Sequence, residues 1–291
     1  MPALRDFRRR IKSLQSTQKI CKAMKAVATA KMAKAQAAVT AARPYARRIH
    51  EVLGRLSQAA GDVKHPLLAV REPNRICYIV VTADRGLCGG FNSNILRTAM
   101  REIHAHPGAA LVAVGRKARN FFRFRRMEMV AEFTGLGEDI KFAHARQIAK
   151  LPIEKYAAGE YDAVYVVYSK FINILVQQPT VVKILPVEPP ADDEEAGKEG
   201  KKHGPQPLYI FEPSAEAVLY DLLPKYVETV IFHAILESKA GEHSARMTAM
   251  DGATKNTEDM IGRLTLKMNR VRQEGITKEL LDIVGGAAAL E

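Results

Sequence analysis

The sequence predicts an α/β domain combined with two long terminal helices that pair as an antiparallel coiled coil. Small or apolar residues recur at alternating steps of three and four near both ends of the chain. The middle of the chain instead alternates short apolar runs with amphipathic stretches. The excess positive charge is concentrated in the first 56 residues, which favours a helix with partners on its outside.

The N-terminal helix is predicted from a spacing that holds from Leu4 to Leu56. Fourteen Lys and Arg residues stand here against two acids, Asp6 and Glu51, so this segment carries the net charge of +12 of the whole chain. A helix of this length is roughly 85 Å long and needs a partner helix. We expect Gln18 and Lys25 to interrupt a seam formed by the following residues: Leu4, Phe7, Ile11, Leu14, Cys21, Ala28, Met32, Ala35, Val39, Ala42, Ala46, Ile49, Leu53 and Leu56.

The partner helix is predicted at the other end of the chain, where the same spacing runs from Leu219 to Val271. Glu212-Pro213-Ser214 is a suitable helix start, because Pro is tolerated in a first turn. Pro224 and three internal glycines are unfavourable in an isolated helix, each Gly by about 1 kcal/mol relative to Ala. The seam holds many small or polar residues, including His233 and His243, so we expect loose packing and outward faces that also contact partners.

The middle of the chain predicts a Rossmann-like head with a mostly parallel sheet. Strands are expected at 76–83, 109–114, 127–133, 163–168 and 180–185, and helices at 92–104, 116–125 and 138–156. A charged, Gly-rich stretch from Asp192 to Gln206 predicts a surface loop. We therefore divide the chain into an N-terminal helix, residues 1–58, a head, residues 74–210, and a C-terminal helix, residues 213–291.

Composition restricts the class of protein. No apolar stretch approaches 18 residues, which excludes a spanning helix, and the N-terminus lacks the apolar core of a signal peptide. Three scattered cysteines predict neither a disulfide framework nor a zinc site, and we expect no cofactor or metal.

Two alternative functions arise from motifs. The turn Gly86-Leu87-Cys88-Gly89-Gly90 follows a strand and precedes a helix, where α/β proteins bind phosphate, yet it lacks the spacing of a dinucleotide fingerprint or a P-loop. Packing against neighbours is the favoured interpretation. The basic helix could bind nucleic acid electrostatically, but no aromatic residues are interleaved with its charges, and an acidic protein partner is a further alternative. We expect no catalytic residues.

Several motifs resemble the γ subunit of F-type ATP synthases, in order and from end to end of the chain. The N-terminal helix carries TQKI at 17–20, KAMKAVA at 22–28 and RPY at 43–45. The head carries TADRGLCGGFN at 82–92 and SKFIN at 169–173. The C-terminal helix carries ARMTAMD at 245–251, ATKN at 253–256, RQEGITKEL at 272–280 and IVGGAAAL at 283–290.

The resemblance implies a central rotor stalk. In that family the coiled coil turns inside a ring of α and β subunits, while the head contacts the ε subunit and the membrane-embedded c-ring. Flow of protons or of sodium ions drives the rotation, and ATP chemistry takes place on the β subunits. This implies no nucleic-acid partner and a position at the cytoplasmic side of a bacterial membrane, peripheral to the membrane through the c-ring.

The resemblance also implies contact residues. Met24 and Lys25 match the segment facing an acidic β-subunit loop, and Arg246 matches a residue of the opposing helix. Arg272 and Gln273 match a pair held by β-subunit loops, and Thr277 and Glu279 belong to the same stretch. Tyr209 and Glu212 match the segment facing the c-ring. The paired cysteines of the plant-chloroplast relatives are absent from the loop after Asp192, so we expect no thiol control.

Overall fold

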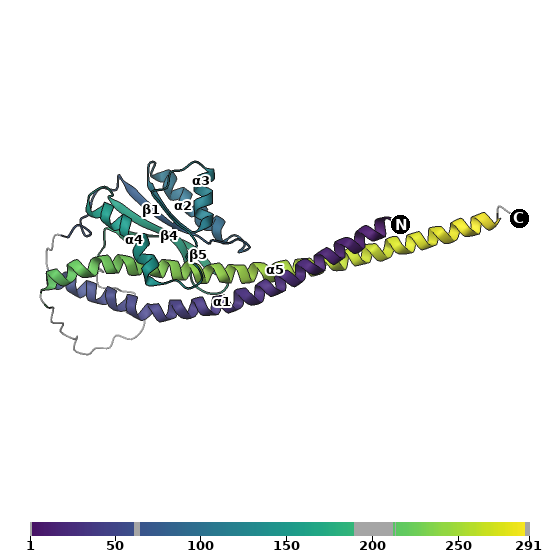
Figure 1. The fold of residues 1–291 in the computed structure, drawn as a ribbon, viewed down its shortest axis with the longest axis horizontal. Helices are drawn as coiled ribbons and strands as arrows, with labels where there is room; N and C mark the ends of the chain where they lie inside the picture. The colour runs from purple at the N-terminus through teal and green to yellow at the C-terminus, as the bar shows by residue number, and fades with distance from the viewer. Residues whose placement is uncertain (1, 61–64, 189–211, 213, 289–291) are drawn as a thin grey trace. The chain divides into compact units, whose positions relative to one another are not determined.

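The computed structural model describes residues 2–60, 65–188, 212 and 214–288 (Figure 1). Contacts group the chain into two compact units. The head unit comprises Ala30–Ala245, and the paired-helix unit comprises Met1–Thr29 and Arg246–Glu291. Two helices, α1 (Pro2–Ala60) and α5 (Ala215–Ala288), contribute to both units. The division into 1–58, 74–210 and 213–291 stays a prediction.

The head unit contains a five-stranded sheet in the order β3-β2-β1-β4-β5. Three parallel pairings join the first four strands, and β5 runs antiparallel to β4. All six residues of the central strand, β1, are buried, as expected for a strand that is covered on both faces of the sheet. The strands are β1 (Ile76–Val81), β2 (Ala110–Val114), β3 (Ala131–Phe133), β4 (Ala163–Phe171) and β5 (Gln177–Leu185).

Helices cover both faces of this sheet (Figure 1). On one face, α2 (Phe91–Ala105) and α3 (Arg116–Phe124) pack against alternate residues of β1, including Tyr78 and Val80. On the other face, Cys77, Ile79 and Val81 share a core with α4 (Phe142–Ala157) and with α1 and α5. The α/β layering and the mostly parallel sheet are therefore confirmed.

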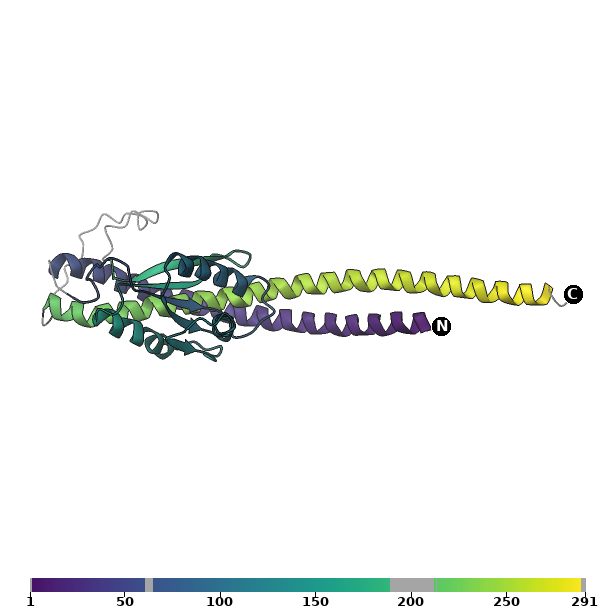
Figure 2. The ribbon, with the colours of Figure 1, turned by 90° about the horizontal axis from the view of Figure 1, so that it is seen from above.

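The terminal helices are antiparallel within each unit (Figure 2). In the head unit, His233 Nε2 donates to the carbonyl of Ala42 at 3.1 Å, and the rings of His50 and Tyr226 stack with centroids 6.0 Å apart. In the paired-helix unit, Lys25 contacts Asp251, and the Lys267 ammonium lies 6.0 Å from the Phe7 ring centroid. As the contacts move forward along α1 from Phe7 to Lys25, their partners move back along α5 from Lys267 to Asp251. The predicted antiparallel pairing is therefore confirmed.

Several element boundaries differ from the predictions. Strand β1 ends at residue 81 instead of 83, β4 runs on to residue 171 instead of 168, and β5 begins at residue 177 instead of 180. Residues 127–130 do not join β3, since the preceding Arg126 adopts a left-handed conformation with φ of 56° and ends the α3 region in a turn. Helix α4 begins at Phe142 and not at residue 138. The left-handed Gly135 and Gly137 place residues 138–141 in a loop instead.

The pairing of α1 and α5 gives a cross-linking prediction. Phe7 lies beside Lys267, so Leu14, seven residues further on, should lie beside the stretch from Ile261 to Leu264. In a background with Cys21 replaced by Ala, Leu14→Cys combined with Ile261→Cys or Leu264→Cys should form a disulfide on mild oxidation.

Gln15→Cys is the matched control for this cross-link, because Gln15 is exposed whereas Leu14 is partly buried. Gel mobility under non-reducing conditions gives the yield. No cross-link from Leu14, or an equal yield from Gln15, would contradict the register.

Candidate subunit interface on the terminal helices

Met24 and Lys25 lie side by side on α1 but have different surroundings. Met24 is partly buried between the buried seam residues Cys21 and Ala28. Lys25 is exposed, and its Nζ donates to Asp251 Oδ1 at 2.6 Å. The prediction that Lys25 occupies the seam is wrong, because the spacing here is three and then four, which gives the seam position to Met24. The hydrogen bond from Lys25 makes the largest contribution to lowering the pKa of Asp251, and a hydrogen bond from Lys255 lowers it further.

The part of α1 in the paired-helix unit presents a basic surface to solvent. Asp6 is its one acidic residue, and it forms an ion pair with Arg9. All the cationic side chains between residues 4 and 29 are exposed: Arg5, Arg8, Arg9, Arg10, Lys12, Lys19, Lys22 and Lys25. Two large apolar side chains, Ile20 and Val27, are also 57% and 55% exposed. Positive charge beside exposed apolar area suits a protein partner with an acidic surface.

The predicted contacts on α5 differ in exposure. Arg246 is buried, with 8% of its surface exposed, and so offers the least area to a partner. Arg272, Gln273, Thr277 and Glu279 are all exposed. Every residue from 276 to 285 is exposed as well, because α1 begins at Pro2 and accompanies α5 no further.

The end of α5 exposes apolar side chains in this unaccompanied stretch. Leu280, Leu281, Ile283 and Val284 are 57–68% exposed. Consecutive apolar side chains left in water are typical of a surface that a partner covers.

The two predicted c-ring contacts lie before α5. Glu212 is exposed, and Tyr209 lies outside the described residues. Ser214 begins the helix, since its hydroxyl oxygen accepts a hydrogen bond from the backbone N–H of Ala217 at 3.2 Å. This is an ordinary N-cap contact, and it begins the helix at Ala215, two residues later than the start expected with Pro213 in the first turn.

The Gly-rich turn is held by a side chain of the helix that follows it, Asn92 of α2. The amide oxygen of Asn92 accepts from the backbone N–H of Ala83 at 2.9 Å, and its Nδ2 lies 3.0 Å from the sulfur of Cys88. Cys88 is buried. Only Cys88 of the turn is buried, while Leu87, Gly89 and Gly90 are exposed, so the favoured interpretation of a packed turn holds for Cys88 alone.

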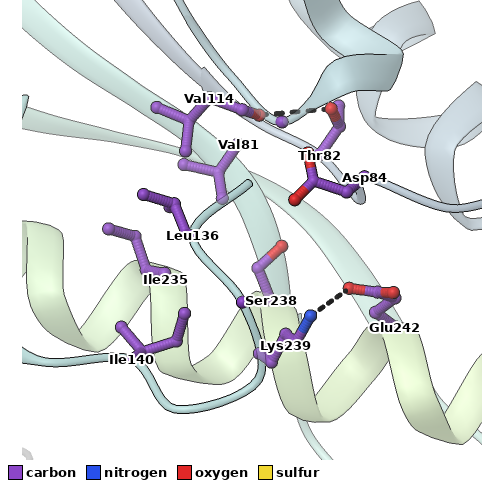
Figure 3. Close-up of a pocket in the computed structure, with 12 residues that line it drawn as sticks. Val81, Thr82, Asp84, Val114, Leu136, Ile140, Ile235, Ser238, Lys239 and Glu242 are labelled. Carbon is purple, nitrogen blue, oxygen red and sulfur yellow. Dashed lines mark hydrogen bonds and ion pairs between the residues drawn. The ribbon is translucent and has the colours of Figure 1, made fainter. Parts of the chain in front are cut away.

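The carboxyl edge of the sheet leaves little space for a ligand. Residues at the ends of β1 and β2, including Thr82 and Asp84, line a cavity together with α5 residues that include Ser238 and Lys239 (Figure 3). The cavity between them measures about 30 Å³. That volume holds roughly one water molecule, whereas cofactor sites measure ~300 Å³ or more. In other open α/β sheets this edge binds nucleotides, whereas here α5 packs against it.

Sequence reasoning missed a polar cluster in the head unit. Glu138, expected in a helix, instead lies in the loop before α4 and contacts Lys31, Lys239 and His243. His243 was expected only to pack in the seam, and it is indeed buried. The two glycines at 135 and 137 were the available signal, because they predict a loop at this point.

Over the described ranges, no helix combines the length and apolarity needed to cross a bilayer. Within the same ranges, no three His, Cys, Asp or Glu side chains are grouped as metal ligands.

Long paired helices with exposed charged faces, and a head whose ligand edge is filled by its own helix, define a subunit that works through contacts with other proteins. The family model described as ATP synthase matches residues 3–290. Relatives named "ATP synthase gamma chain" from Desulforudis audaxviator and Pelotomaculum thermopropionicum are 71% and 62% identical, with all of both chains covered. The chain therefore belongs to the ATP synthase gamma-chain family.

Solved structures agree with this assignment. The central stalk and c-ring structure of the Tetrahymena thermophila mitochondrial ATP synthase is 25% identical, covers 80% of this chain and 99% of that chain, and has a TM-score of 0.61. A chain of the Euglena gracilis enzyme, 17% identical, shares the fold with a TM-score of 0.69 over 99% of this chain and 95% of that one. The role of this chain is that of a central rotor stalk.

Proposed function

We propose that the paired helices turn inside a ring of α and β subunits and that the catalytic sites lie on the β subunits. The head then contacts the ε subunit and the c-ring at the cytoplasmic side of a bacterial membrane, and proton flow through the c-ring supplies the torque. The names of the relatives and the resemblance of the motifs support this arrangement.

The observation that carries the proposal is the basic, exposed surface of α1 between residues 4 and 29. Its opposite helix does not neutralise it, since α5 carries seven Lys and Arg residues against six Asp and Glu residues between positions 246 and 285. Ion pairs at a solvent-exposed surface form and break at a small cost in free energy, because no large apolar contact has to separate with them. Such contacts suit a shaft that meets each β subunit in turn.

We propose contact roles for the exposed residues accordingly. Met24 and Lys25 would meet an acidic β-subunit loop, and Arg272, Gln273, Thr277 and Glu279 would meet loops further along α5. Arg246, which is buried, would act by supporting the helix pair. Glu212 and Tyr209 remain candidates for the c-ring contact.

Neutralising the basic surface tests this proposal. We expect Lys12, Lys19 and Lys22 changed together to Gln to slow association with the α and β subunits by about tenfold at low salt, because electrostatic steering is lost. The difference from the unchanged chain should shrink at high salt. Association is measured by surface binding, and the recovered complex by its ATPase activity.

The matched control removes three charges from head helices. Arg97, Arg146 and Lys150 are exposed on α2 and α4, and their change to Gln should leave association unchanged. An unchanged rate in the α1 variant, or purification of the chain with nucleic acid in place of α and β subunits, would contradict the proposal.

A further inference from the structure

The loop between β3 and α4, residues 134–141, is anchored to the sheet. The backbone N–H of Gly135 donates to Asp84 Oδ2 at 3.0 Å, and the same carboxylate accepts from the N–H of Arg116 through Oδ1 at 2.9 Å. Leu136 and Ile140 of the loop pack against the core that contains Ile235 of α5. The loop therefore moves with the α/β head.

One carboxylate of this loop reaches both terminal helices. Glu138 Oε1 accepts from Lys31 Nζ of α1 at 2.8 Å, and its Oε2 lies 2.9 Å from His243 Nε2 of α5. Lys239 Nζ lies 3.7 Å from Oε2 and also pairs with Glu242 at 3.2 Å. Burial raises the pKa of Glu138, but the Lys31 hydrogen bond and the charges of Lys239 and His243 outweigh it and lower the pKa to about 2.

The burial of the two α5 partners separates this cluster from ordinary surface ion pairs. The side chains of His243 and Lys239 are 3% and 14% exposed, so water screens these contacts less than it screens an exposed pair, whereas Lys31 and Glu138 are 37% and 42% exposed. The neighbouring pair of Lys34 and Asp139, 3.7 Å apart, is 73% exposed on both sides. Loss of Glu138 would remove one of the polar contacts of the buried His243 side chain. Loss of an exposed ion pair has no comparable cost, because water takes the place of the lost partner.

The position of the cluster along the chain gives it a mechanical meaning. The head unit includes α1 from Ala30 and α5 up to Ala245, so Lys31 and His243 lie in the last turns of both helices that belong to this unit. A bond at that point resists sliding or turning of either helix against the head.

We propose that Glu138 is a positioning residue that clamps α1 and α5 together to the α/β head, so that torque on the head passes to both helices at once. The inference rests on the proposed function as a rotor. It assigns to this chain a load-transmitting contact made by one loop carboxylate.

The first test measures the clamp itself in the purified full chain. Glu138→Ala should raise the hydrogen-exchange rate of backbone amides in residues 135–145 and 239–245 by about threefold, because the loop and helices separate more often. Glu138→Gln, which keeps the shape and can accept one hydrogen bond, should show a smaller rise. Asp139→Asn is the matched control and should exchange as the unchanged chain does.

The second test uses the assembled complex in membrane vesicles. Glu138→Ala should lower the ratio of ATP-driven proton pumping to ATP hydrolysis by about threefold, with Glu138→Gln intermediate and Asp139→Asn unchanged. Equal ratios for Glu138→Ala and the unchanged chain, or an equal loss in Asp139→Asn, would overturn the clamp.

Failure of the clamp is distinguishable from failure of the rotor assignment. If Glu138→Ala leaves pumping intact while Met24→Lys impairs it, the clamp is wrong and the rotor stands. If the chain does not assemble with α and β subunits at all, the proposed function is wrong. The exchange measurement on the full chain still decides whether Glu138 fastens the helices.

Discussion

Met24→Lys is expected to reduce ATP-driven proton pumping about tenfold and ATP hydrolysis less. A tenfold slowing of one rotational step corresponds to about 1.4 kcal/mol added to its barrier. Met24 is partly exposed beside Lys25, so a longer charged side chain can reach solvent without breaking the helix pair. Opposite an acidic β-subunit loop, the added ammonium would form an extra ion pair that must break at each step.

Salt and a neutral variant separate this electrostatic cause from lost packing. The defect should ease as salt is raised, because screening weakens a partly exposed pair. Met24→Gln has similar length without the charge and should stay coupled. Pumping and hydrolysis are measured on the same vesicles. An equal defect in Met24→Gln, or an equal loss of hydrolysis and pumping, would remove Met24 from the coupling surface.

Gly115→Ala is expected to destabilise the fold by about 3–5 kcal/mol. Gly115 lies between β2 and α3 with φ of +95°, and an added Cβ would come within 2.2 Å of the Thr82 carbonyl oxygen. The backbone cannot retreat easily, because the Gly115 N–H donates to Phe133 at 2.7 Å and the Thr82 N–H donates to Val114 at 2.8 Å. Both strain and overlap therefore act at this turn.

Gly108→Ala is the matched control for this substitution. Gly108 has a similar φ of +86°, but no atom lies within 4 Å of an added Cβ. Only the backbone strain remains, which costs about 1–2 kcal/mol. Urea unfolding of both variants followed by circular dichroism gives the two free energies. Equal losses would mean that the close approach of Thr82 does not constrain the turn.

The sequence predicted those parts of the fold that depend on local pattern. The apolar run at Ile76–Val81 became the fully buried β1, and the heptad spacing became the paired helices α1 and α5. The pattern failed where two spacings compete. Between Cys21 and Ala28, a step of four and then three puts Lys25 in the seam, whereas a step of three and then four puts Met24 there. The expected spacing selects Lys25, and the structure has Met24.

The contacts made over long separations could not be predicted from pattern. Glu138 lies 107 residues from Lys31 and 105 from His243, and no local signal pairs them. A helix interpretation of 138–156 even placed Glu138 in the wrong element. The contact residues implied by resemblance, from Met24 to Glu279, stay predictions, and the burial of Arg246 appears only once the helices are packed.

Rotation of this chain within its complex tests the central claim most directly. A bead is attached to a cysteine introduced at Asn94, an exposed residue of α2, and the α and β subunits are fixed to glass. On addition of ATP, the bead should turn continuously in one direction, and it should stop when ATP is removed. A bead that only fluctuates, on complexes that hydrolyse ATP at the normal rate, would contradict the assignment of this chain as the rotor.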